Sequence, residues 1–138
     1  MIKQYCIDKS LQIAKQLFPK DYAKRTRYRT YHYAFGYIGK KLIGIGLNQP
    51  DVVNAKAMYF GKRFNIKTFQ DFSYLHAEIS LISKLWGKVH IDDSLAIYVI
   101  RLNKFGKEQD SKPCKNCQTI LDALGIIDVY WSPFYPTE

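Results

Sequence analysis

Four side chains of the sequence have the types and the spacing of a metal-dependent catalytic site. His76 and Glu78 stand two residues apart in the run HAEIS, and Cys114 and Cys117 stand three apart in KPCKNC. A Cys-x-x-Cys pair at a helix start lets both sulfurs reach one ion, and the helix dipole there favours thiolates. One histidine and two cysteines leave the fourth position of a zinc site open for water. Glu78 is then well placed to move protons to and from that water.

The same residues allow two other interpretations. The cysteine pair is compatible with a thioredoxin-like redox motif, although the Trp-Cys-x-Pro-Cys context is missing and Pro113 precedes the pair. A structural zinc site needs a fourth protein ligand, and the remaining candidates for it are His32, His90 and Cys6. The odd number of cysteines argues against a disulfide scaffold.

Hydrophobic periodicity predicts an α/β fold in a single domain, residues 1–138. The predicted helices cover residues 7–18 (ended by Pro19), 54–64, 73–87 and 114–124 (followed by Gly125). The predicted strands cover 31–38 and 41–47 (joined by a tight turn at Gly39-Lys40), 94–102 and 126–131, and 104–112 is a polar loop. The continuous apolar run 94–102 indicates a strand that is covered on both faces, with parallel connections in this half of the chain.

The excess of positive over negative charge lies in the first half of the chain. The chain carries a net +9, while residues 1–67 hold fourteen Lys and Arg but only three Asp, a net +11. Residues 68–138 carry a net −2. A basic half suggests a polyanionic partner, most often nucleic acid, and the alternative is a solubilising surface. The high hydrophobic content, 47%, excludes a disordered chain.

The chain resembles the zinc-dependent deaminase superfamily that acts on cytosine or adenine bases. The resemblance lies in the motif HAE at one helix start, a following strand, and the motif PCKNC at the next helix start. The resemblance covers about residues 28–132 in element order. It implies a cytidine deaminase-like three-layer α/β/α fold with a mixed sheet of about four strands, without the family's C-terminal helix and fifth strand. It also implies that His76, Cys114 and Cys117 bind Zn²⁺, with Glu78 as the proton shuttle for attack of zinc-hydroxide on C4.

The resemblance extends to substrate contacts. It implies that the backbone N–H of Ala77 holds the base carbonyl, that the carbonyl of Lys112 accepts the exocyclic amine, and that Asn48 contacts the nucleotide. Tyr130 and Trp131 fall where the family often places base-contacting aromatics. The alternative for Asn48 is a turn residue before Pro50, and the alternative for the two aromatics is the core.

The sequence context narrows the substrate class that the resemblance implies. A histidine as first ligand differs from the three cysteines of the small tetrameric nucleoside deaminases. SKPCKNC, after a strand that ends in Arg101 and a polar loop, looks most like small AID/APOBEC-like polynucleotide deaminases of phages and bacteria. The basic and aromatic connector then suits a single strand, through Arg25, Arg27, Tyr28 and Arg29.

We therefore expect hydrolytic deamination of cytosine to uracil in single-stranded nucleic acid, DNA or RNA. The alternatives are a deaminase of free nucleotides such as dCMP and a catalytically silent nucleic-acid-binding module on the same fold. The last strand is expected at the edge of the sheet, where either the N-terminal helix and the segment SPFYPTE cover it or a second copy of the chain does so in a homodimer. No apolar run approaches the roughly 18 residues of a membrane span, and no signal-peptide core is present, so we expect a cytoplasmic protein of a bacterium or a phage-infected cell.

Overall fold

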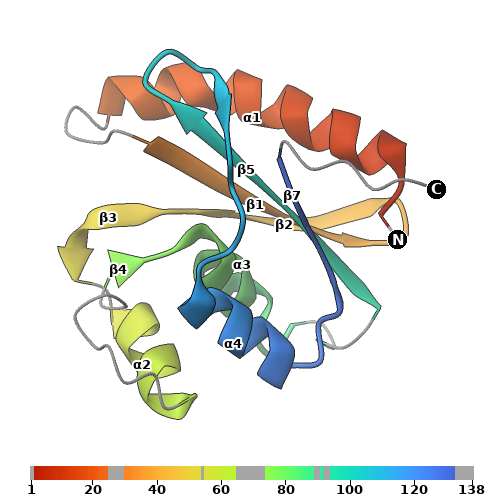
Figure 1. Ribbon diagram of the computed structural model, residues 1–138, viewed down its shortest axis with the longest axis vertical. Coiled ribbons are helices and arrows are strands. Elements are labelled where there is room, and N and C mark those ends of the chain that lie inside the picture. The colour runs from red at the N-terminus through yellow and green to blue at the C-terminus, as the bar shows by residue number, and fades with distance from the viewer. Residues whose placement is uncertain are drawn as a thin grey trace.

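The computed structural model describes residues 2–24, 30–53, 55–64, 74–88, 91 and 94–132 (Figure 1). Its elements in chain order are α1 (Gln4–Lys24), β1 (Thr30–Ile38), β2 (Lys41–Leu47), β3 (Gln49–Val53), α2 (Ala55–Arg63), β4 (Tyr74–Leu75), α3 (Ala77–Leu85), β5 (Leu95–Asn103), β6 (Glu108–Gln109), α4 (Lys115–Ala123) and β7 (Asp128–Trp131). The α/β fold class is thereby confirmed. Among the described helices, none is both long and apolar enough to cross a membrane.

A mixed sheet of five strands forms the centre of the fold. Its order is β2-β1-β5-β6, and β7 also pairs with β5. The pairs β1–β2, β1–β5 and β5–β6 are antiparallel, whereas β5 and β7 are parallel. The parallel pair confirms the predicted parallel connection, with α4 in the crossover. Within the described part of the chain β7 pairs with β5 alone, so it is an edge strand.

Residue alternation along β1 and β5 decides which side chains face which helices. Tyr31, Tyr33, Phe35 and Tyr37 of β1 join the core beneath α1, together with Tyr98, Ile100 and Leu102 of β5. The intervening residues of β5, Leu95, Ile97 and Val99, join the core beneath α3 and α4. The two sheet faces, named the α1 side and the α3 side from here on, are both covered by helices (Figure 1). The prediction that 94–102 is covered on both faces is therefore confirmed.

Two glycine turns lie where the sequence predicts them. Gly39 has φ 61° between β1 and β2, a left-handed backbone that glycine adopts without a steric cost. Gly125, with φ 76°, ends α4, and the N–H of Ile126 bonds back to the carbonyl of Leu121 at 3.0 Å. These turns fix the register of the β1–β2 hairpin and the direction in which β7 leaves α4.

The prediction that Pro19 ends the first helix is wrong. Helix α1 continues through Pro19 to Lys24. Packing beyond the proline holds the last turn in place, because the Phe18 ring contacts the rings of Tyr22 and Tyr31. The hydroxyl of Tyr33 also donates to Asp21 Oδ2 at 2.8 Å. Tertiary contacts thus outweigh the hydrogen bond that the proline cannot donate.

The expectation of about four strands is also wrong, because part of the predicted loop 104–112 returns to the sheet. Asn103 Oδ1 accepts the backbone N–H groups of Phe105 and Lys107, and this side-chain turn reverses the chain. Strand β6 then pairs with β5 at Arg101↔Gln109. A separate ribbon of β3 and β4 precedes α3, so α3 begins at Ala77 and not at residue 73.

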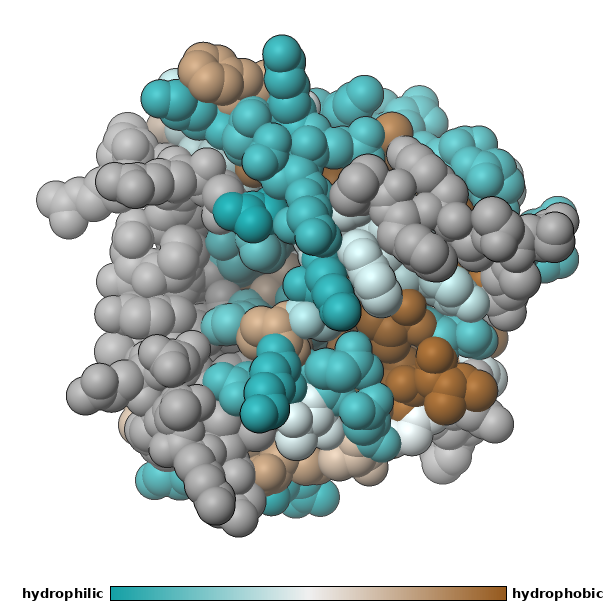
Figure 2. Space-filling view, in the orientation of Figure 1, coloured by the Kyte–Doolittle hydropathy of each residue, from teal (hydrophilic) through white to brown (hydrophobic). Residues whose placement is uncertain are grey.

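The segment that leads from β5 to α4 forms a ridge on the surface. Figure 2 shows it as a hydrophilic band above α4, with hydrophobic surface over the lower end of β7. Ile127, at that end of β7, is 74% exposed. The ridge carries the chain into Cys114, so its internal contacts position one of the candidate ligands.

Gly46 sets the position of α3 on the sheet. A Cβ atom at this position of β2 would lie 2.2 Å from the carbonyl oxygen of Ala77 and 2.5 Å from the backbone nitrogen of Leu81. Helix backbone and strand backbone are therefore in direct contact, which only glycine permits. This contact fixes the first turn of α3, next to His76.

Gly46→Ala should displace α3 and reduce the free energy of unfolding by about 3 kcal/mol, because backbone atoms cannot move aside as side-chain tips do. Gly44→Ala is the matched control, since a Cβ there meets only the side chains of Leu81 and Leu85 at 3.1 and 3.2 Å. Chemical denaturation measures both variants. Equal losses in the two variants would contradict the role assigned to Gly46.

Candidate metal centre

Two helix N-termini meet on the α3 side of the sheet and bring three potential ligands together. His76 is the N-cap of α3 and Cys114 is the N-cap of α4, both with extended backbone (φ −82°, ψ 153° and φ −67°, ψ 165°). Cys117 follows in the first turn of α4. Since N-cap side chains project from the helix end, the two caps face one another across the junction.

The distances between the ligand atoms match a zinc site. His76 Nδ1 lies 3.6 Å from Cys114 Sγ and 3.4 Å from Cys117 Sγ. The ligand atoms of all three residues lie within 4.8 Å of one another. Tetrahedral zinc with Zn–S near 2.3 Å and Zn–N near 2.0–2.1 Å separates nitrogen from sulfur by about 3.6 Å. The described residues therefore contain a His/Cys/Cys group that fits zinc, named the metal-ligand cluster below.

No fourth His, Cys, Asp or Glu joins this cluster among the described residues. Cys6 lies in the core on the α1 side, where its thiol contacts the carbonyl of Gly39 at 3.6 Å. His32 lies on β1 and is not a member of the cluster. His90 lies outside the described residues. Cys6 and His32 thus do not supply the fourth ligand of a structural zinc site.

Glu78 lies beside the cluster with its carboxyl group buried. It is 4% exposed, and its carboxyl group hydrogen-bonds to the Cys117 side chain and to its own backbone N–H. Burial raises the pKa of this carboxyl, and the nearby His76 acts in the opposite direction. A carboxyl whose pKa is raised holds a proton more readily near neutral pH, which suits a group that accepts and returns protons.

The two cysteines of the cluster differ in their affinity for protons. The pKa of Cys114 is lowered to about 4 because its sulfur accepts a hydrogen bond from the Cys117 thiol, and His76 acts in the same direction. The backbone N–H of Cys117 also donates to Cys114 Sγ at 3.4 Å. Burial raises the pKa of Cys117 well above its usual value. Cys114 is thus ready to bind a metal as a thiolate, and Cys117 must release a proton to do so.

Ser111 anchors the segment that leads into Cys114, and its role could not be inferred from the sequence. It is buried, and its hydroxyl lies 2.7 Å from the carbonyl oxygens of both Val99 and Ser132. Its backbone N–H also donates to the carbonyl of Ser132 at 2.9 Å. The serine thereby joins β5, β7 and the chain before Pro113. The sequence offers only the position of this serine in SKPC, before the cysteine pair. That position does not predict its hydrogen bond to Ser132, 21 residues further along the chain.

Ser111→Ala should loosen this junction and weaken zinc binding about tenfold, the lower end of the range for residues that support metal ligands. Stability should fall by only about 1 kcal/mol, because both carbonyls keep a backbone N–H donor. Thr119→Ala, which removes an exposed hydroxyl bonded to the carbonyl of Lys115, is the control. Competition with a chromogenic chelator measures the affinities. Zinc affinity equal to that of the wild type in Ser111→Ala would refute the positioning role.

The structure places Asn48, Ala77 and Lys112 around this centre in different ways. Ala77 is the first residue of α3, and the N–H at that position has no partner within its own helix. Lys112 is exposed on the ridge and lies two residues before Cys114. Asn48 is buried, and its Oδ1 accepts the backbone N–H of His32 at 3.0 Å. Asn48 therefore holds the end of β2 against β1, whatever else it contacts.

Tyr130 and Trp131 face opposite sides of the sheet because they are adjacent on β7. Trp131 packs partly buried against the core on the α3 side, and Lys112 Nζ lies 5.8 Å from its ring centroid. Tyr130 packs on the α1 side, where its hydroxyl donates to Asp128 Oδ1 at 3.3 Å. The fold brings Trp131 to the same side as the metal-ligand cluster and does not bring Tyr130 there.

The expected nucleic-acid contacts are only partly located. Arg25, Arg27, Tyr28 and Arg29 lie outside the described residues. Other basic residues of the first half belong to α1, which covers the sheet face opposite the metal-ligand cluster (Figure 1). Among the described residues, the lysines of α1 therefore lie away from the metal-ligand cluster, on the other side of the sheet.

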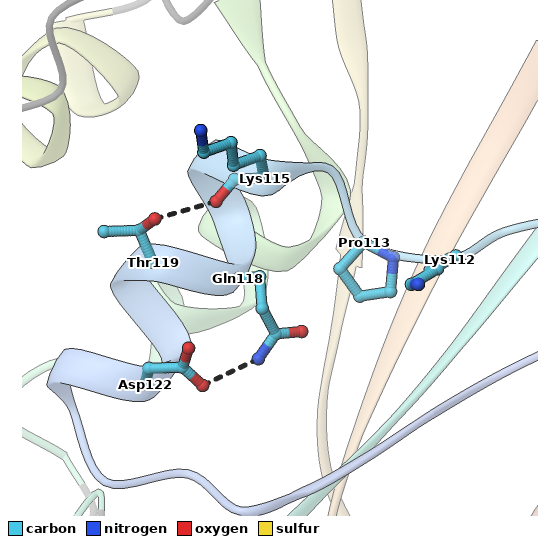
Figure 3. A pocket seen from close by; sticks show the side chains of 6 residues that line it. All are labelled: Lys112, Pro113, Lys115, Gln118, Thr119 and Asp122. Carbon is cyan, nitrogen blue, oxygen red and sulfur yellow. Dashed lines mark hydrogen bonds between the residues drawn. The ribbon is translucent and has the colours of Figure 1, made fainter.

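A pocket of about 390 Å³ lies along α4, outside the metal-ligand cluster. Figure 3 shows its lining, which is Lys112, Pro113, Lys115, Gln118, Thr119 and Asp122. Gln118 Nε2 donates to Asp122 Oδ1 at 2.8 Å within the helix. None of the three metal ligands lines this pocket. The pocket is therefore separate from the metal-ligand cluster and bears on the site only through Lys112 and Lys115.

Comparison of the chain with models of protein families, with curated proteins and with solved structures gives no match in any of the three. The metal-ligand cluster is therefore interpreted from its own geometry and chemistry.

Proposed function

We propose that this protein is a zinc-dependent hydrolase that deaminates cytosine to uracil. The observation that carries the proposal is the placement of the buried Glu78 carboxyl against Cys117, beside a His/Cys/Cys group of suitable ligand spacing. Three ligands leave room for water and substrate, which is the arrangement of catalytic zinc sites. The resemblance of HAE and PCKNC to the deaminase superfamily supplies the reaction.

The chemical change is the replacement of the amino group at C4 by an oxygen from water. Zinc, when bound by His76, Cys114 and Cys117, supplies Lewis acidity and a water-derived nucleophile near neutral pH. Glu78 takes one proton from the attacking water and passes it to the ring nitrogen N3. It then takes the remaining proton from the new C4 hydroxyl and passes it to the amine, so that the C4–N bond breaks, ammonia leaves and the C4 carbonyl forms. The products are uracil and one ammonia.

Two backbone groups orient the base in this proposal. The N–H of Ala77, at the start of α3, donates to the base carbonyl, and the carbonyl of Lys112 accepts the exocyclic amine. Both groups belong to the segments that carry His76 and Cys114, so the same contacts that hold the ligands also hold the base. Gly46 and Ser111 keep these segments in place.

Single-stranded nucleic acid is the proposed substrate. Lys112 over the Trp131 ring places a cation and an aromatic face on the α3 side of the sheet, and Lys115 at the start of α4 adds an exposed cation. Such a combination suits phosphates and unstacked bases. Free cytidine nucleotides such as dCMP are the second candidate, favoured by the location of the α1 lysines on the opposite face of the sheet.

The substrate class is tested by incubating the zinc-loaded protein with a single-stranded DNA oligonucleotide, its RNA equivalent and dCMP, each at 50 and 200 mM salt. Activity on a strand should fall at least tenfold between these salt levels, because several phosphate contacts release counterions. Activity on dCMP should change far less. Efficient turnover of dCMP with none on either strand would contradict the polynucleotide proposal and support the second candidate. Strand binding without ammonia release from any substrate would instead identify a silent binding module.

A further inference from the structure

Arg101 is a partly buried cation with no acidic partner among the described residues. Alternation from Ile97 and Val99 places its side chain on the α3 side of the sheet, the side of the metal-ligand cluster. Its Nη1 makes one long hydrogen bond, 3.4 Å, to the carbonyl of Asp110. Its Nε is buried and has no hydrogen-bond partner. The edge of the guanidinium formed by Nε and Nη2 thus remains free of described protein acceptors.

His32 lies directly opposite Arg101 on the neighbouring strand. The two residues are a cross-strand pair of β1 and β5, which brings their side chains within reach of each other. Neither ring nitrogen of His32 hydrogen-bonds to a described residue. Burial and then the charge of Arg101 lower the pKa of His32 to about 4, and the charges of His76 and Cys114 also act on it. His32 is therefore a neutral ring beside Arg101, within electrostatic range of His76 and Cys114.

A buried guanidinium Nε without an acceptor carries a desolvation cost, and a ligand that supplies the acceptor removes that cost. The free side-on edge of an arginine matches two oxygens of a phosphate group, and a neutral imidazole N–H supplies a further donor. Among the described residues, no carboxylate competes for this edge. The acidic neighbour Asp110 contributes only its carbonyl.

We propose that Arg101 and His32 form a phosphate-binding subsite beside the metal-ligand cluster, which holds a phosphate group of the nucleotide being deaminated. This inference rests on the proposed function for the identity of the substrate, but not for the existence of the subsite. The phosphate comes either from a free nucleotide, as a monoester, or from a strand, as a diester. The two sources share the chemistry that Arg101 recognises.

The first test uses inorganic phosphate with the zinc-loaded protein and needs no turnover. Titration should shift the Nε–Hε NMR signal of Arg101, which is assigned by its loss in Arg101→Gln. Phosphate affinity measured by calorimetry should fall at least tenfold in Arg101→Gln. It should also fall at least tenfold in Arg101→Lys, which keeps the charge but lacks the pair of N–H donors that can bind two phosphate oxygens. Lys107→Gln removes an exposed charge from the same hairpin and should bind phosphate as the wild type does. An unmoved Arg101 signal, or equal affinity in Arg101→Gln, would overturn the subsite.

Thermal stability separates a binding role from a structural one. If Arg101 is kept for a ligand, Arg101→Gln should unfold at the same or a higher temperature than the wild type, because an unpaired charge has been removed. If Arg101 instead supports the fold, the melting temperature should fall by several degrees, and the proposal fails.

The second test compares deoxycytidine, dCMP and a single-stranded oligonucleotide as substrates. Arg101→Gln should lower kcat/KM at least tenfold for dCMP alone if the subsite takes the monoester, or for the strand if it takes the diester. Deoxycytidine turnover should not change. Phosphate binding at Arg101 without any deamination would refute the proposed function and leave the subsite standing. Deamination that is indifferent to Arg101 would refute the subsite alone.

Discussion

Glu78→Gln should lower kcat for cytosine deamination by about 10²- to 10⁴-fold, the range for a general acid–base group, while one zinc per chain is retained. The amide has the shape of the carboxyl group but cannot take up and return a proton. Glu78 contacts Cys117 without being a member of the metal-ligand cluster, so zinc content should survive the change. Single-turnover kinetics and elemental analysis on the same preparation measure both quantities.

Asp122→Asn provides the matched control for this change. It also replaces a carboxylate by an amide, but on the exposed surface of α4, where the Asp122 carboxylate accepts a hydrogen bond from Gln118 in the same helix. Its kcat should stay within twofold of the wild type. A Glu78→Gln protein that keeps both its zinc and its full rate would exclude Glu78 as the proton carrier.

Cys117→Ser should lose zinc altogether at micromolar metal. Cys117 is fully buried and its sulfur lies 3.4 Å from His76 Nδ1, so its replacement leaves only two of the three ligands of the cluster. Zinc at about 1,000 times its Kd stabilises a folded protein by about 4 kcal/mol, and this contribution disappears with the site. Denaturation of the wild type with and without excess zinc should show the difference, and Cys117→Ser should show none.

Cys6→Ser distinguishes loss of the site from loss of a buried cysteine in general. Cys6 is also fully buried, but it lies on the α1 side of the sheet. This variant should keep one zinc per chain and the zinc-dependent increment of stability. Full zinc occupancy in Cys117→Ser, or loss of zinc in Cys6→Ser, would contradict the assignment of the ligands.

Local patterns were sufficient to predict the elements whose formation depends on local chemistry. The apolar run in β5, the glycine turn at Gly39 and the helix end at Gly125 all lie where periodicity and turn chemistry place them. The convergence of His76, Cys114 and Cys117 was also predictable, because each stands at a helix start and the two helices share one side of the sheet.

Features that depend on contacts between distant residues could not be predicted in this way. Helix α1 passes Pro19 because Phe18 and Asp21 find partners on β1. The sequence predicts Ser111 only as a loop residue. Its role is visible in the structure, where its hydroxyl bonds to the carbonyl of Val99 in β5 and to that of Ser132 after β7. Arg101 does carry a weak signal, since alternation from Val99 puts it on the α3 side, but its lack of an acidic partner is visible only in the structure.

The most direct test of the account is mass spectrometry of the reaction products in H₂¹⁸O. Zinc-loaded wild type should convert cytosine, in a single-stranded oligonucleotide or in dCMP, to uracil that carries one solvent oxygen at C4, with one ammonia released per uracil. The yield should vanish after zinc removal and return when zinc is added back. A zinc-loaded protein that binds these substrates but forms neither uracil nor ammonia from any of them would contradict the account.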